Sequence, residues 1–137
     1  MHRAGPGDRR GAREALTGGR ITGVGGVFFK ARDHDELCAW YRERLGVPLE
    51  PEGWHPFEWA LPGSTTFAVF SPETSYLGDG EFMINFRVDD LDVLLARLRA
   101  ECITVDDRVE ETENGRFGWV VDPEGNRVEL WQPATGQ

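Results

Sequence analysis

Hydrophobic and polar positions follow two periodicities along this chain. Residues 82–88 alternate, with one set of side chains apolar and the other mixed, as expected of a strand with one buried face. The apolar set is Phe82, Ile84, Phe86 and Val88, and the mixed set is Met83, Asn85 and Arg87. A glycine-rich segment that becomes apolar, residues 21–31, predicts an earlier strand of the same kind.

Each of these strands is followed by a segment with helical spacing. Asp33 and the acidic residues after it supply an N-cap and a negative first turn, which predicts a helix that continues through Leu45 and ends at Gly46. Its apolar stripe consists of Leu37, Trp40, Tyr41 and Leu45. The pair Asp89 and Asp90 predicts a second helix over residues 91–101.

Short apolar segments after each helix predict three further strands in each half. They lie near residues 47–49, 57–61 and 65–70, and then from 103–105 onward, at 116–121 and at 127–131. Between the last two, residues 122–126 read Asp-Pro-Glu-Gly-Asn, which suits a type I turn followed by a left-handed glycine. This hairpin pairs Val121 with Arg127, Trp119 with Glu129 and Phe117 with Trp131.

The two halves form an internal repeat. Residues 27–33 superpose on residues 84–90 with an offset of 57, and each copy continues as acidic cap, helix and three strands. Residues 1–20 are rich in glycine and arginine without apolar periodicity, and we expect a disordered tail there.

The motifs of the two copies resemble those of a known superfamily. They are Phe29, Asp33, Trp40-Tyr41-Arg42 and Leu45-Gly46, then residues 86–91 and Leu98-Arg99, then residues 122–130. Together they resemble the vicinal oxygen chelate superfamily, which includes glyoxalase I, bleomycin-resistance proteins, fosfomycin-resistance proteins and extradiol dioxygenases. The resemblance covers residues 21–133 and implies one α+β domain of two βαβββ modules, about 21–75 and 81–133. The modules are expected in a pseudo-twofold arrangement, as an open, barrel-like mixed sheet around a cleft, and the chain is expected to form a homodimer.

Charge and composition indicate which classes of binding partner are not expected. The whole chain has a net charge of −9, and residues 1–20 carry +3. The remaining residues therefore carry a net charge of −12. A body this acidic repels phosphate backbones, and nucleic acid is not expected as a ligand. No apolar run approaches the ~20 residues that cross a bilayer, and the first residues lack the apolar stretch of a secretory signal. We therefore expect a cytoplasmic protein that binds no membrane. Cys38 and Cys102 are expected to be buried free thiols, and no pattern places a histidine beside either.

The predicted hairpin puts Phe117, Trp119, Glu129 and Trp131 on one surface. So apolar a surface around a carboxylate is typical of a ligand cleft, although a dimer interface or an inner core has the same composition. Lys30 and Arg87 suit an anionic or carbonyl-bearing ligand in that cleft, or else each pairs with a surface acid. The predicted ligand-binding residues are Phe28, Lys30, Met83, Asn85, Arg87, Phe117, Trp119, Arg127 and Trp131.

The resemblance also implies where a metal would be held. It places the four ligand positions at Gly26, Ala68, Met83 and Glu129, and only Glu129 suits a hard or borderline metal. His55 and Glu58 are possible substitutes, but the strand register that would turn Glu58 toward the cleft is left open. We expect no cofactor, with a divalent metal as the less favoured case. Glu129 is then a hydrogen-bond acceptor or a lone general base, unless Arg87 or Arg127 pairs with it.

Three functional hypotheses follow. The first is a bleomycin-resistance-like protein that binds a small molecule in an aromatic-lined cleft without a metal. The second is a glyoxalase-like lyase or isomerase in which the predicted catalytic residue, Glu129, moves a proton or holds a metal. The third is a non-catalytic, dimeric regulatory protein whose pocket is vestigial.

Overall fold

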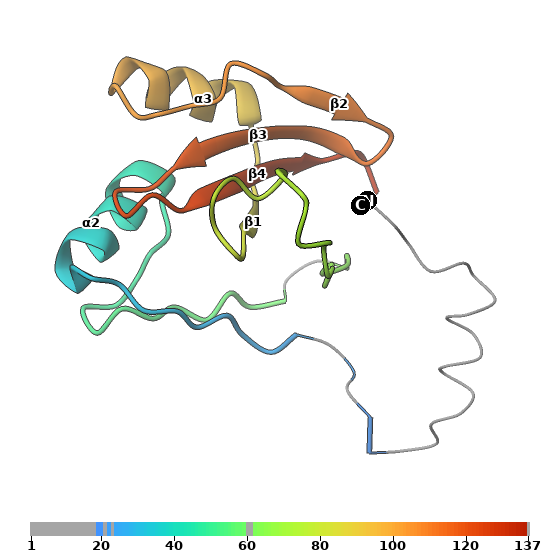
Figure 1. Ribbon diagram of the computed structural model, residues 1–137, viewed down its shortest axis with the longest axis horizontal. Helices are drawn as coiled ribbons and strands as arrows, with labels where there is room; N and C mark the ends of the chain where they lie inside the picture. The colour runs from blue at the N-terminus through green and yellow to red at the C-terminus, as the bar shows by residue number, and fades with distance from the viewer. Residues whose placement is uncertain (1–18, 21, 23, 60–61, 137) are drawn as a thin grey trace. The chain divides into compact units, whose positions relative to one another are not determined.

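The computed structural model describes residues 19–20, 22, 24–59 and 62–136 (Figure 1). These residues belong to two compact units. One comprises residues 1–28 and 65–74, and the other comprises residues 29–64 and 75–137. The predicted tail at residues 1–20 lies almost entirely outside the described residues.

The larger unit contains a four-stranded mixed sheet. In chain order its strands are β1 (Ile84–Arg87), β2 (Glu110–Thr112), β3 (Gly115–Val121) and β4 (Arg127–Pro133). Their spatial order is β1-β4-β3-β2, with β1 parallel to β4 and the other pairs antiparallel (Figure 1). The described strands do not close into a barrel. A mixed sheet with helices confirms the α+β class.

Two helices accompany the sheet, and both begin directly after their predicted N-caps, while α3 ends one residue before the predicted end at residue 101. Helix α2 (His34–Leu45) begins after Asp33, whose side chain accepts a hydrogen bond from the Glu36 N–H, and ends at Gly46, which has a left-handed φ of 72°. Helix α3 (Leu91–Ala100) begins after Asp90, whose side chain accepts from the Val93 N–H. Figure 1 shows α3 lying along β3.

The hydrophobic core lies between the helices and one face of the sheet. Val120, Val128 and Leu130 point to this face because they alternate with the side chains of the other face along β3 and β4. The helices contribute Leu37 and Tyr41 from α2, and Leu91, Leu95 and Leu98 from α3. Phe86 of β1 packs against this cluster, whereas Asn85 and Arg87 are exposed, so the predicted alternation of β1 is confirmed.

The β3–β4 hairpin has the predicted turn and the predicted register. Gly125 has a φ of 83°, and Asp122 and Asn126 close the turn through an N–H to carbonyl hydrogen bond of 2.9 Å. Across the ladder Val121 faces Arg127, Trp119 faces Glu129 and Phe117 faces Trp131. The sequence pattern alone therefore placed these six side chains correctly.

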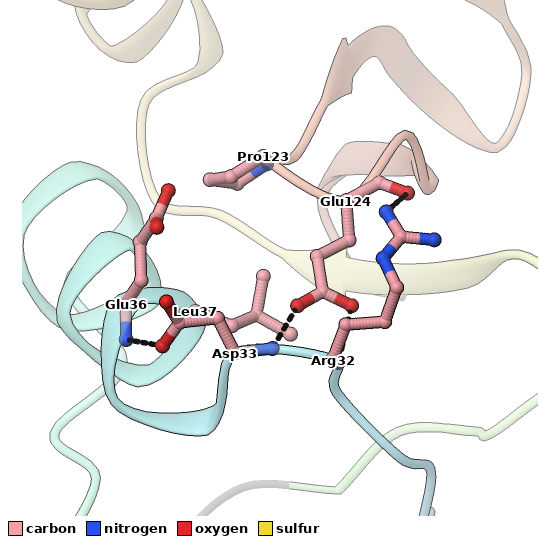
Figure 2. A pocket seen from close by; sticks show the side chains of 6 residues that line it. All are labelled: Arg32, Asp33, Glu36, Leu37, Pro123 and Glu124. Atoms are coloured by element: carbon pink, nitrogen blue, oxygen red, sulfur yellow. Dashed lines mark hydrogen bonds between the residues drawn. The ribbon is translucent and has the colours of Figure 1, made fainter.

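The turn is also joined to helix α2. The buried Asp122 accepts hydrogen bonds from the Tyr41 hydroxyl at 2.9 Å and from the Asn126 side chain at 2.8 Å. At the rim, the Glu124 carboxylate accepts from the backbone N–H groups of Arg32 and Asp33, both at 2.8 Å (Figure 2). Two carboxylates of one turn thus hold α2, and the two residues that precede it, to the last hairpin.

Some predicted strands are absent from the described residues. The described residues of the predicted strands at 21–31, 47–49, 57–61 and 65–70 form no strand, and residues 21, 23, 60 and 61 lie outside the described part. Strand-like alternation shows that a segment can pair, and pairing also needs a neighbouring edge. In the second half, Val105 forms an isolated bridge with Val120, and the strand proper begins five residues later at Glu110.

The second βαβββ module is therefore formed nearly as predicted. The first contributes helix α2 but no strand among its described residues, so the two-module arrangement is not confirmed. In the smaller unit, the described residues contain one turn, closed by the Thr74 N–H to the Ser71 carbonyl at 3.1 Å. None of the described helices is both long and apolar enough to cross a bilayer.

Candidate functional site

The candidate site lies on the sheet face opposite the helices. We call this surface the aromatic face, and it is formed by Asn85 and Arg87 of β1, Phe117 and Trp119 of β3, and Arg127, Glu129 and Trp131 of β4. The parallel pairing of β1 with β4 places Asn85 beside Glu129 and Arg87 beside Trp131. Every member was predicted to line the cleft, and the strand register brings all seven together.

Glu129 is the buried charge at the centre of this face, with 7% of its surface exposed. Three side chains of the described chain donate hydrogen bonds to its carboxylate. The Asn85 amide donates to Oε1 at 2.8 Å, the Trp119 indole donates to Oε2 at 2.9 Å, and the Tyr76 hydroxyl also donates to Oε2. All three donors are neutral groups, and together they supply a hydrogen bond to each oxygen of the buried carboxylate.

Tyr76 covers Glu129 from the loop that precedes β1. Its ring meets the Trp119 ring edge to face, with the centroids 6.1 Å apart. Burial, and then the hydrogen bond to Glu129, raise the pKa of the Tyr76 phenol far above its usual range, so it remains a donor. Its carbonyl accepts from Arg127 Nε at 3.1 Å, which ties the loop to β4.

Two arginines cover the Trp119 ring. Their guanidinium carbons lie 5.0 Å (Arg108) and 5.2 Å (Arg127) from its centroid, and Trp119 is fully buried. Arg127 also pairs with Asp106 at 3.4 Å. The Arg108 backbone N–H, and then Arg127, lower the pKa of Asp106. The predicted alternative in which Arg127 pairs with Glu129 is therefore wrong, because Asp106 takes that role.

A second, more open part of the face is a stack of flat groups. The Arg87 guanidinium lies 4.7 Å from the Trp131 ring centroid, and Phe117 is stacked with Trp131 at 6.0 Å with an interplanar angle of 6°. The Trp131 indole donates to the Asn114 carbonyl at 2.9 Å, which fixes the ring. Arg87 donates to the Ser64 carbonyl at 3.0 Å. This arrangement presents stacking surface with a cation at one end.

The residues around Glu129 do not suit a divalent metal. An indole N–H cannot ligate, and the Trp119 indole occupies one oxygen of the carboxylate. Met83, the nearest implied ligand along the chain, offers only a thioether. Among the described residues no group of three or more histidine, cysteine or acidic side chains is positioned for a metal ion. His55 packs against Phe57 with the ring centroids 4.9 Å apart, and Glu58 is exposed.

The remaining predicted ligand-binding and metal-ligand positions lie outside the aromatic face or belong to the smaller unit. Met83 is half-buried directly before β1, and Lys30 is exposed. Phe28, Gly26 and Ala68 belong to the smaller unit, so their relation to Glu129 stays a prediction. Ligand binding by any of these residues likewise stays a prediction.

Sequence reasoning missed Tyr76 and Arg108 and misjudged the cysteines. Tyr76 and Arg108 lie in loops, where no periodicity marks which way a side chain points. Cys102 is exposed rather than buried, and Cys38 is half-buried with its Sγ 3.8 Å from His34 Nε2. The expectation that no histidine lies beside a cysteine was therefore wrong, although the spacing of four on a predicted helix carried the signal.

A hollow lies between helix α2 and the hairpin turn, away from the aromatic face. Its lining is polar, and the Glu124 carboxylate already occupies the backbone N–H groups that an anion would use (Figure 2). Hydrogen bonds from Asp33, and then Arg32, lower the pKa of Glu124, so it stays charged there. The hollow is lined by Arg32, Asp33, Glu36, Leu37, Pro123 and Glu124. We regard it as a structural contact.

Comparisons with known proteins agree with this fold. The profile of the glyoxalase-like domain family matches residues 26–131. One similar solved structure is a glyoxylase/bleomycin resistance protein/dioxygenase domain from Frankia sp. EAN1pec, with 21% identity, a TM-score of 0.52, and coverage of 86% of this chain and 96% of that one. Another is TnmS3, an antibiotic binding protein from Streptomyces sp. CB03234, with 24% identity, a TM-score of 0.53, and coverage of 83% and 98%.

The comparison with curated proteins finds no match. The two structural neighbours are too distant in sequence to indicate more than the fold, whereas the family profile spans most of the chain. The protein therefore belongs to the glyoxalase-like domain family, within the vicinal oxygen chelate superfamily.

Proposed function

We propose that this protein binds a small, flat molecule on the aromatic face and does so without a metal. The observation that carries the proposal is that the Glu129 carboxylate accepts hydrogen bonds from three neutral donors. These donors are the side chains of Tyr76, Asn85 and Trp119. In metal-using relatives a carboxylate at this strand position ligates the ion, whereas here the same position is held by hydrogen bonds. TnmS3, with the same fold, is described as an antibiotic binding protein, and the proposal assigns this chain a comparable role.

The stack formed by Arg87, Trp131 and Phe117 supports a ligand with an aromatic ring and a negative or carbonyl end. Trp131 and Phe117 are half-buried and nearly parallel, so a ring that extends their stack gains dispersion and excludes water. The Arg87 guanidinium at the end of the stack supplies donors for a carboxylate or carbonyl oxygen.

Catalysis by Glu129 is the alternative, and the geometry favours it less. A carboxylate has about four lone-pair positions, and three of those on Glu129 receive donors. Little capacity is left to accept a substrate proton. A regulatory dimer with a vestigial pocket is the other alternative, and it requires that no ligand stabilise the folded chain.

The direct test is a titration with matched naphthalene probes. We expect 2-naphthoate to bind more tightly than 2-naphthamide, by about tenfold, because one charge-assisted pair is worth roughly 1–2 kcal/mol. Arg87→Gln should remove this difference between the probes. Arg97→Gln is the matched control, since Arg97 lies on α3 and pairs with Glu101. Isothermal titration calorimetry gives both affinities.

Other outcomes decide between the proposals. If no aromatic acid, amide or amine of such a panel raises the melting temperature, the binding proposal is wrong, because a ligand of the folded state must stabilise it. Stoichiometric metal in the purified protein, measured by elemental analysis, would contradict the metal-free site. Turnover that Glu129→Gln abolishes would establish the enzyme alternative.

We further propose that the protein acts as a cytoplasmic homodimer. Superfamily members commonly dimerise, and β1 and β2 are the edge strands of the described sheet, where a strand of a second chain could be added. Light scattering coupled to size-exclusion chromatography tests the oligomeric state. A mass of one chain at all concentrations would contradict it.

A further inference from the structure

A second cluster of reactive side chains lies on helix α2, away from the aromatic face. Cys38 and His34 are one turn apart on this helix, with Sγ 3.8 Å from Nε2, which is within range of a sulfur hydrogen bond. On the other side of the ring, His34 Nδ1 lies 3.2 Å from Asp35 Oδ1. A carboxylate, an imidazole and a thiol therefore follow one another in contact.

The order of these contacts sets the direction of proton transfer. When Nδ1–H donates to Asp35, the Nε2 lone pair faces Cys38, so the imidazole is in the tautomer that can accept the thiol proton. The thiolate, not the thiol, is the nucleophile. A neighbouring base that takes the proton as the sulfur reacts is the usual means of activating a cysteine.

The backbone at Gly53 fits closely over the His34–Cys38 pair. Gly53 has a φ of 96°, and a Cβ there would lie 2.6 Å from His34 Nε2 and 3.2 Å from Cys38 Sγ. The tight turn from Glu50 to Trp54 holds this backbone, through the Gly53 N–H to the Glu50 carbonyl at 2.8 Å. Any side chain at position 53 would displace the imidazole or the sulfur.

We propose that Cys38 is a covalent modification site for soft carbon electrophiles of the conjugated-carbonyl class, with His34 as its base. The Sγ–H bond breaks and the proton passes to His34 Nε2, while Sγ forms a bond to the far carbon of the conjugated double bond. The π pair moves to the carbon beside the carbonyl, which then takes the proton from Nε2. The product is a thioether, the imidazole is regenerated, and no oxidant or further reactant is needed.

Cys102 provides an internal control. It is exposed after the end of α3, and among the described residues no imidazole is hydrogen-bonded to it. If exposure governed reactivity, Cys102 would react faster than the half-buried Cys38. If the His34 contact governs it, the order is reversed.

The test is the rate of labelling by limiting N-ethylmaleimide near neutral pH. Trypsin separates the two thiols, because Arg32 and Arg42 bracket Cys38 whereas Arg99 and Arg108 bracket Cys102. We expect Cys38 to be labelled several-fold faster than Cys102. His34→Gln should slow Cys38 by about tenfold, below the ~10²-fold of a fully positioned base because the 3.8 Å contact is long, and should leave Cys102 unchanged.

Further variants separate a chemical role of His34 from a structural one. Gly53→Ala should slow Cys38 in the same way, and free imidazole should restore part of the rate in His34→Ala at Cys38 alone. The proposal is overturned if Cys38 reacts no faster than Cys102. It is also overturned if His34→Gln has no effect, or if His34→Ala slows Cys38 without rescue. Melting curves of each variant show whether faster labelling of both thiols reflects unfolding.

Discussion

The hydrogen bonds at Glu129 lead to a prediction about stability that does not depend on any ligand. In Glu129→Gln the amide oxygen can replace Oε2 and still accept from Tyr76 and Trp119, while the new NH₂ group replaces Oε1 and faces Asn85. Rotating the Asn85 amide by half a turn then presents its oxygen to that NH₂ group. All three contacts survive in neutral form.

The cost follows from the difference between charged and neutral hydrogen bonds. A bond to a charged group contributes about 1.5–3 kcal/mol and a neutral one about 0.5–1.5 kcal/mol. Glu129→Gln replaces three charged hydrogen bonds by neutral ones, and the bond at Asn85 counts for less because that residue is exposed. We therefore expect a loss of about 2–3 kcal/mol in the free energy of unfolding. Glu129→Ala instead strands the indole N–H of the fully buried Trp119 and leaves a cavity, and we expect a loss of at least about 4 kcal/mol.

Urea denaturation followed by tryptophan fluorescence measures both losses. The double variant Asn85→Asp/Glu129→Gln restores a charged acceptor opposite the new NH₂ group, and it should recover about 1 kcal/mol relative to Glu129→Gln alone. The reasoning fails if Glu129→Ala is no less stable than Glu129→Gln, since the donors would then not depend on an acceptor. If a divalent metal increased the stability of the original protein but not that of either variant, Glu129 would instead be a metal ligand.

Three further predictions concern the rest of the larger unit. Tyr41→Phe removes one donor from the buried Asp122 and should lower the free energy of unfolding by about 1.5–3 kcal/mol in a denaturant titration, whereas Cys102→Ser at an exposed site should change it little. Gly115→Ala should cost about 4 kcal/mol or more, because its φ is 126° and a Cβ would lie 2.2 Å from the Gln132 carbonyl oxygen; Gly125→Ala, with nothing within 4 Å, is the milder control in thermal melting. Because the pKa of Glu124 is lowered on folding, its contribution is present above its ordinary value of 4.5 and is lost as the pH falls through the depressed pKa. Glu124→Gln should therefore reduce the slope of stability against pH in acid, and an unchanged slope would show that the contact to Arg32 and Asp33 does not stabilise the fold.

The sequence predicted best the parts of the molecule whose signals are local. Asp33 and Asp90 fixed the starts of both helices, and the turn at residues 122–126 fixed the register that brings Trp119 opposite Glu129. A cap or a turn needs only a few neighbouring residues, so its geometry can be inferred from their types.

The sequence predicted worst the features that depend on distant partners. The segments at residues 47–49 and 65–70 have strand-like composition, yet neither forms a strand in the described structure. Tyr76 reaches Glu129 across 53 positions of sequence, and no pattern around Tyr76 indicates that contact. The choice of Asp106 rather than Glu129 as partner of Arg127 depends on how a loop folds back over the sheet.

The contacts between helix α2 and the last hairpin have a consequence for the order of folding. Tyr41 meets Asp122 across 81 positions, and Glu124 meets Asp33 across 91. The helix can form early from its own caps, but its docking surface is complete only after the hairpin turn has been made. At ~5–20 residues per second a ribosome needs several seconds to add that stretch. During synthesis Leu37 and Tyr41 of α2 therefore lack their final packing partners until the C-terminal hairpin has been made, and that hairpin completes the core that α2 shares with α3.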